Sequence, residues 1–157
     1  MTERSKGVRV EPESEPERRG QLAREHLREK ILSIDYDAVE DTVVQRLAEY
    51  LDRSNASCYV MGLSGGVDSS VVAVLAAKAV GPHRTVALIM PDSTSTPRED
   101  VEDATWLAQQ LGLRYYAAPI DALLSAASTS IPLFDAHDLP PLGNLKARLR
   151  MVMLYYV

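Results

Sequence analysis

Residues 58–70 read CYVMGLSGGVDSS, and this stretch decides the fold. The run from Cys58 to Leu63 is short, apolar and rich in residues that favour extended backbone, so it predicts a buried β-strand. The next three residues, Ser64-Gly65-Gly66, predict a turn. The alanine- and valine-rich run from Ser69 to Val80 then predicts a helix.

Two later stretches repeat the strand pattern. Thr85–Met90 and Leu113–Ile120 are short apolar runs that predict a second and a third strand. Between them, Thr96 and Glu99 form a capping-box pattern around Pro97, which predicts the start of a helix. Strands that alternate with helices predict an α/β fold, Rossmann-like, with a parallel sheet and helices on both faces.

The region before the first strand divides into two parts. Residues 1–20 hold five basic and five acidic residues and almost nothing apolar, so they predict a disordered tail. Residues 21–157 form the predicted domain. Within it, Gln21–Ser33 predicts a moderately amphipathic helix, and Asp37 with Glu40 forms a capping-box pattern that predicts a second helix.

The region after the third strand predicts a short helix from Asp121, a proline-rich loop over residues 131–143 and a last helix capped by Asn144. The chain stops within this apolar helix, and three strands make a thin parallel sheet. We therefore expect the chain to be the N-terminal part of a larger domain, incomplete at its C-terminus.

Charge and composition exclude several classes of protein. The chain carries 17 basic and 22 acidic residues, a net charge of −5, so it has no broad attraction for nucleic acid. Cys58 is the only cysteine among 157 residues, which excludes an internal disulfide and favours a reducing compartment. The apolar runs are too short to predict a membrane span, and the charged N-terminus does not resemble a signal peptide. We expect a cytoplasmic protein.

The glycine loop between the first strand and its helix carries the chemistry. Gly65 and Gly66 allow backbone conformations that other residues rarely adopt, and the amides that follow them converge at a helix N-terminus, which attracts anions. Asp68 would repel a phosphate by itself, so its presence suggests a bridging Mg²⁺. No lysine follows the glycines, which excludes a Walker loop. The alternative is a plain glycine turn capped by serines.

Three stretches carry a family resemblance. SGGVDS at residues 64–69 is similar to the loop of the N-type ATP pyrophosphatases, which cleave ATP between its α and β phosphates. ALIMPDS at 87–93 with TPREDVEDA at 96–104 resembles the second-strand region of NAD synthetases, and GNLKARLRM at 143–151 resembles a signature of that family. The resemblance covers roughly residues 35–157. It favours the ammonia-dependent type, because 61 residues before Gly62 are too few for an amidase domain.

The resemblance implies a reaction and its partners. In this family, ATP adenylates the nicotinate carboxylate of deamido-NAD and releases pyrophosphate, and ammonia then displaces AMP to form NAD. No nucleophilic side chain is needed, so no catalytic residue is expected. The family also implies a homodimer and Mg²⁺.

The resemblance assigns binding residues one by one. The expected ATP-binding residues are Gly62, Leu63, Ser64, Gly65, Gly66, Val67, Asp68, Ser69 and Met90. Asp68 would also bind Mg²⁺, and Arg148 would contact deamido-NAD. The family's further ATP, metal and substrate residues would follow the last helix, so the chain carries half of a site, and we expect little amidation from it alone.

Each assignment has a structural alternative. Asp68 could complement the dipole of the helix, Met90 could be ordinary core, and Arg148 with Arg150 could be the solvated edge of a helix. Two functional alternatives also stay open. One is a related enzyme such as an ATP-dependent sulfur transferase, although no cysteine follows Cys58. The other is a truncated, inactive nucleotide-binding remnant.

Overall fold

The computed structural model describes residues 14–157, which divide into two compact units between Val39 and Glu40. Helix α1 (Glu15–Leu32) and the start of helix α2 (Tyr36–Arg53) belong to the first unit. The remaining helices and all three strands belong to the second unit. Within the described part of the chain, none of the helices combines the length and the apolar character that crossing a membrane requires.

Helix α1 begins at Glu15, inside the segment expected to be disordered. That expectation is wrong for residues 15–20, and residues 1–13 lie outside the described part of the chain. Low hydrophobicity opposes packing into a core, but it does not prevent a helix, and the segment is rich in Glu and Arg, which favour helices. Leu22 and Leu27 of α1 are exposed.

Helix α2 is capped by Asp35, not by the predicted Asp37. The Asp35 carboxylate accepts a hydrogen bond of 3.0 Å from the amide of Ala38, as N-cap side chains do. Glu40, the predicted partner in the capping box, instead pairs with Lys78 of helix α3 (Val67–Val80). The predicted helix is confirmed. Its predicted cap is wrong, because the helix begins at Tyr36, so Asp37 lies inside the first turn and Asp35 precedes it.

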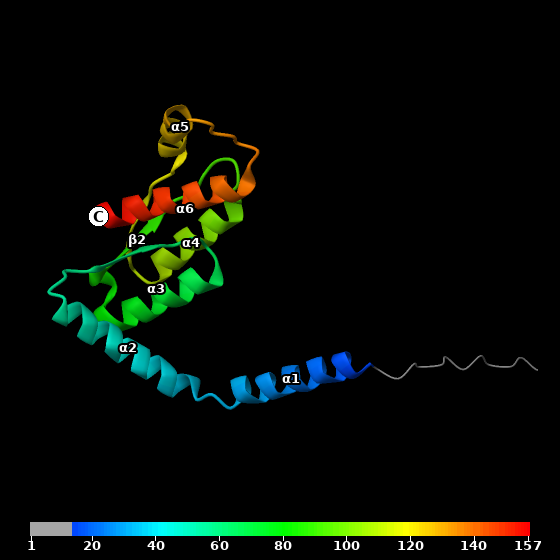
Figure 1. The fold of residues 1–157 in the computed structure, drawn as a ribbon. Coiled ribbons are helices and arrows are strands. Elements are labelled where there is room, and N and C mark those ends of the chain that lie inside the picture. Colours follow the sequence, from blue (N-terminus) through cyan, green and yellow to red (C-terminus); the bar gives the residue numbers. More distant parts are fainter. Residues whose placement is uncertain (1–13) are drawn as a thin grey trace, which may run out of the picture. The chain divides into compact units, whose positions relative to one another are not determined.

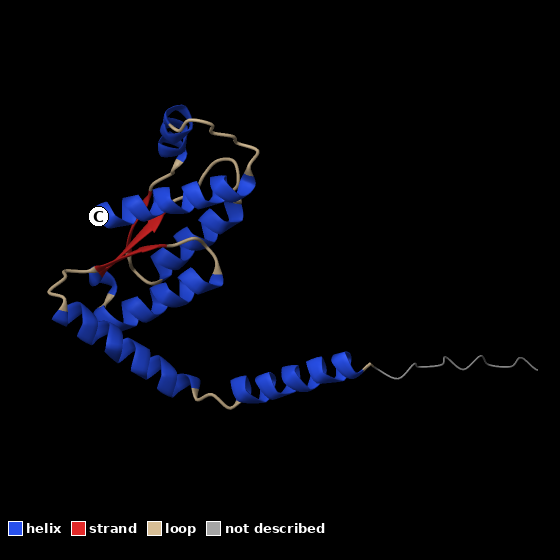
Figure 2. Cartoon of the chain, in the orientation of Figure 1, coloured by secondary structure: helices blue, strands red, loops and turns tan. Residues whose placement is uncertain are grey.

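Three parallel strands form the sheet of the second unit, with β2 in the centre. The strands are β1 (Tyr59–Gly62), β2 (Thr85–Ile89) and β3 (Arg114–Ala117) (Figure 2). Val86 of β2 lies opposite Val60 of β1 and opposite Arg114 of β3. The predicted α/β fold with a parallel sheet is therefore confirmed.

Helices cover both faces of this sheet (Figure 1). Successive residues of β2 point to opposite faces. Ala87 and Ile89 pack in a core cluster with alanines of α3 and of α4 (Arg98–Gln110). Leu88 points the other way, where helix α6 (Leu139–Tyr156) contributes Met153 and Leu154. All five residues of β2 are buried, which explains its continuous apolar sequence.

Short elements connect these layers. The 3₁₀ helix η1 (Pro82–Arg84) joins α3 to β2, and helix α5 (Asp121–Ser130) lies between β3 and α6. The predicted helix from Asp121 is thus confirmed.

The predicted capping box at α4 is wrong. The helix begins at Arg98, and no side chain caps its first turn. The hydroxyl of Thr96, the predicted cap, instead accepts a hydrogen bond of 3.0 Å from the amide of Asp92. The turn over residues 92–96 therefore uses the oxygen that the capping-box pattern assigned to the helix.

Helix α6 begins at Leu139, five residues before the predicted cap Asn144. Its first turn contains the two prolines at 140 and 141. Proline is tolerated there because the first amides of a helix have no partner within it. The proline-rich stretch over residues 131–143 is therefore a loop only in its first part, and Asn144 lies inside the helix.

Candidate functional site

A cleft of about 510 Å³ lies beyond the carboxyl ends of β1 and β2, the edge at which open α/β sheets bind ligands. Its wall comes from four segments of the chain. They are residues 62–64 at the end of β1, residues 88–91 at the end of β2, residues 95–97 with 100 and 101 at the start of α4, and Arg150 with Leu154 of α6. The cleft thus brings together residues far apart in the sequence.

The glycine loop is held in shape by its own serines. The Ser69 hydroxyl donates to the Gly66 carbonyl at 2.9 Å and accepts a hydrogen bond of 3.2 Å from the Ser64 amide. The Ser70 hydroxyl also donates to the Gly66 carbonyl, at 2.9 Å. The first-turn amides of α3 have no acceptor within the helix. Free amides at the N-terminus of a helix are a common binding site for anions.

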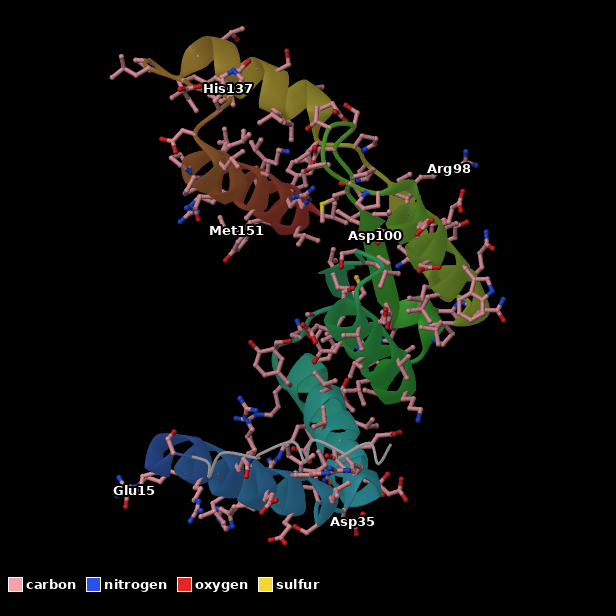
Figure 3. The ribbon with its side chains drawn as sticks, turned by 90° about the vertical axis from the view of Figure 1, so that its right-hand side faces the viewer. Glu15, Asp35, Arg98, Asp100, His137 and Met151 are labelled. Atoms are coloured by element: carbon pink, nitrogen blue, oxygen red, sulfur yellow. The ribbon has the colours of Figure 1, made fainter. Side chains whose placement is uncertain are left out.

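Gly65 is the tightest position of the loop. Its φ of +84° lies in the left-handed region. A Cβ at this position would lie 2.8 Å from the Cα of Asp100 and closer still to the Asp100 carbonyl oxygen. Figure 3 labels Asp100, which lies on the first turn of α4 and lines the cleft. The glycine therefore lets the loop approach the α4 backbone, as a residue with a side chain could not.

Asp92 is the centre of a polar cluster beside the cleft. Its side chain is 1% exposed, and its Oδ1 accepts hydrogen bonds from the amides of Thr94 and Ser95 at 3.2 and 2.9 Å. The hydroxyls of both residues also donate to the carboxylate, each at 2.7 Å. The carboxylate thus closes a compact turn after β2.

Two cations of α6 bind this carboxylate. Lys146 Nζ donates to Asp92 Oδ1 at 2.9 Å, and Arg150 Nη2 donates to Oδ2 at 3.3 Å. Arg150 Nε also donates to the Met90 carbonyl at 2.8 Å, just beyond the end of β2. The interpretation of Arg150 as a solvated helix edge is therefore wrong.

The hydrogen bonds around Asp92 decide its charge. Burial favours the neutral acid and raises the pKa, but the hydrogen bonds from Thr94, Ser95 and Lys146 outweigh it. The net result holds the pKa of Asp92 well below its ordinary value of 3.8, so the group is a carboxylate at neutral pH.

Asp121 holds the same turn from a second side. Its Oδ1 accepts hydrogen bonds from the Ser93 hydroxyl and amide, at 2.6 and 2.9 Å. The hydrogen bond from the Ser93 hydroxyl is the largest of the causes that lower the pKa of Asp121. The turn after β2 is therefore tied to α5 as well as to α6.

The structure brings together part of the predicted site. The predicted ATP-binding residues that line the cleft are Gly62, Leu63, Ser64 and Met90. The segment from Gly65 to Ser69 continues from there into α3, with Asp68 exposed. Met90 is also part of the core, as the structural alternative held. Arg148 does not line the cleft: its Nη1 donates to the carbonyl and side-chain oxygens of Asn144 at 3.2 and 3.3 Å.

The sequence analysis missed Asp92, Lys146 and Arg150 as members of one cluster. A signal for two of them was present, since residues four apart on a helix share a face and Lys146 precedes Arg150 by four. Two cations on one face of an apolar helix need a carboxylate as a counter-ion if that face is buried. Nothing local could identify that carboxylate as Asp92, which lies 54 residues earlier.

The fold and the glycine loop define an α/β protein of the Rossmann-like PP-loop class, which is named after the pyrophosphatase loop. The family model described as NAD synthase matches residues 39–157. This chain belongs to the NAD synthase family.

Two curated relatives carry the same name. The chain is 44% identical over 126 residues to the NH(3)-dependent NAD(+) synthetase of Staphylothermus marinus, a match that covers 80% of this chain and 46% of the relative. It is also 44% identical over 128 residues to the protein of that name from Aeropyrum pernix, covering 80% and 45%. The chain therefore spans about half the length of the curated relatives it matches.

Two solved structures are similar as well. The NH3-dependent NAD synthetase of Campylobacter jejuni superposes with a TM-score of 0.71 at 32% identity, covering 78% of this chain and 52% of that one. The NMN synthetase of Francisella tularensis superposes with a TM-score of 0.72 at 34% identity, covering 79% and 50%.

Proposed function

We propose that this chain forms the ATP-binding part of an ammonia-dependent NAD synthetase, which amidates deamido-NAD with ammonia and ATP. The observation that carries the proposal is the position of the cleft. It lies between the glycine loop and the turn after β2, two segments within the region that the family model matches. ATP would place its phosphates at the amides of the loop and its adenine near Met90.

The chemistry explains why binding and orientation are enough. A carboxylate is a poor electrophile, and adenylation converts it into a group from which AMP can leave. The protein's task is to align the α-phosphate with the nicotinate carboxylate and to stabilise charge as pyrophosphate leaves. The loop amides can do this without a nucleophilic side chain.

A magnesium ion fits this site only when it binds together with ATP. Among residues 14–157, no group of three or more His, Cys, Asp or Glu side chains is arranged to hold a metal. Mg²⁺ is commonly bound by one or two carboxylates together with substrate phosphates and water. Asp68, exposed on the first turn of α3, offers one such carboxylate. When bound, the ion would neutralise phosphate charge.

We expect Asp68→Asn to weaken the binding of Mg–ATP about tenfold, because the substitution removes a metal-binding carboxylate and keeps the shape of the side chain. The affinity for ATP without Mg²⁺ should not fall, since one negative charge near the phosphates is removed. Isothermal titration calorimetry with and without Mg²⁺ measures both. Asp103→Asn is the matched control, as Asp103 is exposed on α4 and does not line the cleft. Equal Mg–ATP affinity in both variants would show that Asp68 does not bind the metal.

We expect Arg148→Ala to weaken deamido-NAD binding about tenfold and to leave ATP binding unchanged, because the guanidinium offers paired donors for a carboxylate or phosphate. Its bonds to Asn144 leave other donors of the guanidinium for a ligand. Titration of each ligand separately measures the effect. Arg46→Ala, at an exposed arginine of α2, is the control. A loss of ATP affinity instead would place Arg148 in the ATP site.

The function itself is tested by the product. An enzyme that contains this ATP-binding part should form NAD, AMP and pyrophosphate from Mg–ATP, ammonia and deamido-NAD, whereas the 157-residue chain by itself should form little NAD. Because one similar structure is an NMN synthetase, the corresponding mononucleotide acid belongs in a parallel reaction. Preferential formation of NMN, or sulfur transfer without any amide product, would overturn the proposal. A homodimer follows from the family resemblance and a cytoplasmic location from the composition, and both stay predictions.

A further inference from the structure

Lys146 is a buried cation behind the wall of the cleft. It is 8% exposed and does not line the cleft. Its ammonium group contacts three oxygens of the turn after β2: Asp92 Oδ1 at 2.9 Å, Ser95 Oγ at 3.0 Å and Thr94 Oγ1 at 3.3 Å. Burying an ammonium is costly unless it is paired and hydrogen-bonded. The position of Lys146 is therefore specified by this turn.

The atom that Lys146 binds also holds the backbone of the turn. Asp92 Oδ1 accepts the amides of Thr94 and Ser95. The amide and carbonyl of Asp92 in turn bond to the Thr96 hydroxyl and amide, at 3.0 and 3.1 Å. Ser95 and Thr96 line the cleft. The conformation of the cleft wall therefore depends on a carboxylate that Lys146 helps to fix.

Arg150 completes the connection to α6. Lys146 binds one carboxylate oxygen, and Arg150 binds the other as well as the Met90 carbonyl. Lys146, Arg150 and the ionised carboxylate of Asp92 together carry one positive unit beside the cleft, whose wall also includes Asp100. Arg150 reaches the cleft itself, whereas Lys146 can act on a ligand only through the turn.

We propose that Lys146 is a positioning residue for nucleotide binding: through Asp92 it holds residues 92–96 in the conformation that forms the cleft wall. The inference rests on the proposed function, because the affinity for ATP is used to detect a change in the conformation of the cleft wall. It assigns a role to a residue that does not touch the ligand.

The test compares substitutions at three positions of the whole chain: Lys146, Lys78 and Thr94. Lys146→Met removes the cation but keeps an unbranched apolar stem. Lys146→Arg keeps a cation with several donors. Lys78→Met removes an exposed lysine that pairs with Glu40, outside the cleft, and serves as the matched control. Thr94→Val removes one hydroxyl from the cluster without changing its charge, so it remains informative where Lys146→Met does not fold.

Two measurements are made on each folded variant: the Kd of Mg–ATP by calorimetry and the hydrogen exchange of the Thr94 and Ser95 amides by NMR. We expect Lys146→Met to raise the Kd about tenfold and to speed exchange at both amides. Thr94→Val should raise the Kd about threefold and should also speed exchange at both amides. Lys146→Arg should return the Kd to within about threefold of the unmodified chain. Lys78→Met should change neither quantity.

The outcomes separate the inference from the proposed function. Unchanged ATP affinity in folded Lys146→Met, or unchanged exchange at Thr94 and Ser95, would overturn the positioning role. Failure of Lys146→Arg to restore binding would overturn it too. If the unmodified chain binds no ATP, the proposed function fails, and the exchange measurement by itself then decides whether Lys146 holds the turn.

Discussion

Replacing Gly65 with alanine is expected to destabilise the fold by about 3 kcal/mol and to reduce ATP affinity at least about tenfold. Two effects add. Alanine is strained at a φ of +84°, and its Cβ would lie 2.8 Å from the Cα of Asp100, a backbone atom that cannot rotate away. Relief requires either the loop or the start of α4 to move. Both border the cleft, so stability and binding should fall together. Urea unfolding and ATP calorimetry measure the two effects.

Gly66→Ala is the matched control for that experiment. Gly66 has a φ of −77°, which alanine adopts freely, and a Cβ there would lie 3.4 Å from the Ser64 hydroxyl, which can rotate. Its free energy of unfolding should change by less than about 1 kcal/mol. Equal stability losses at the two glycines would show that the close approach of Gly65 to Asp100 does not determine the conformation of the loop.

Replacing Asp92 with alanine is expected to cost about 3–5 kcal/mol of stability, because it leaves the buried Lys146 without its counter-ion. It also removes the acceptor of the Thr94 and Ser95 amides. Asp52→Ala is the control: Asp52 is 71% exposed and pairs with Arg84 at 3.5 Å, so its loss should cost less than about 1 kcal/mol. Comparable losses for the two aspartates would contradict the burial argument.

The same carboxylate predicts a dependence of stability on pH. Folding lowers the pKa of Asp92, so the unfolded chain binds more protons at this group than the folded chain does. Its contribution is complete above the ordinary value of 3.8 and is lost as the pH falls below it. The difference in unfolding free energy between the unmodified chain and Asp92→Asn should therefore narrow as the pH falls from 5 toward 2, values that span the titration range of an aspartate at about pH 4. A constant difference would show that folding does not shift the pKa of Asp92, and a difference that widens as the pH falls would show that folding raises it.

Local patterns determined the fold class from the sequence. Apolar runs of strand length, glycine turns and helical spacing depend on neighbouring residues, and they predicted the three strands and the order of the helices. The same holds for the glycine loop, whose conformation follows from Gly65 and its strand-to-helix junction. Helix boundaries were predicted less well. The oxygen of Thr96 accepts a hydrogen bond from the Asp92 amide in the turn before the helix, so it does not cap the helix.

The sequence by itself therefore determined an α/β chain with an anion-binding loop, and its motifs identified the family. Only the tertiary structure decided what forms the rest of the cleft. Asp92 and Lys146 are 54 residues apart, and their pairing required α6 to cover the face of β2 that carries Leu88. Both residues lie in stretches that carry the family resemblance, but no local pattern predicts their pairing, since lysine and aspartate are usually solvated. Burial changes this: once water is excluded, each charge requires the other, and together they hold the wall of the site.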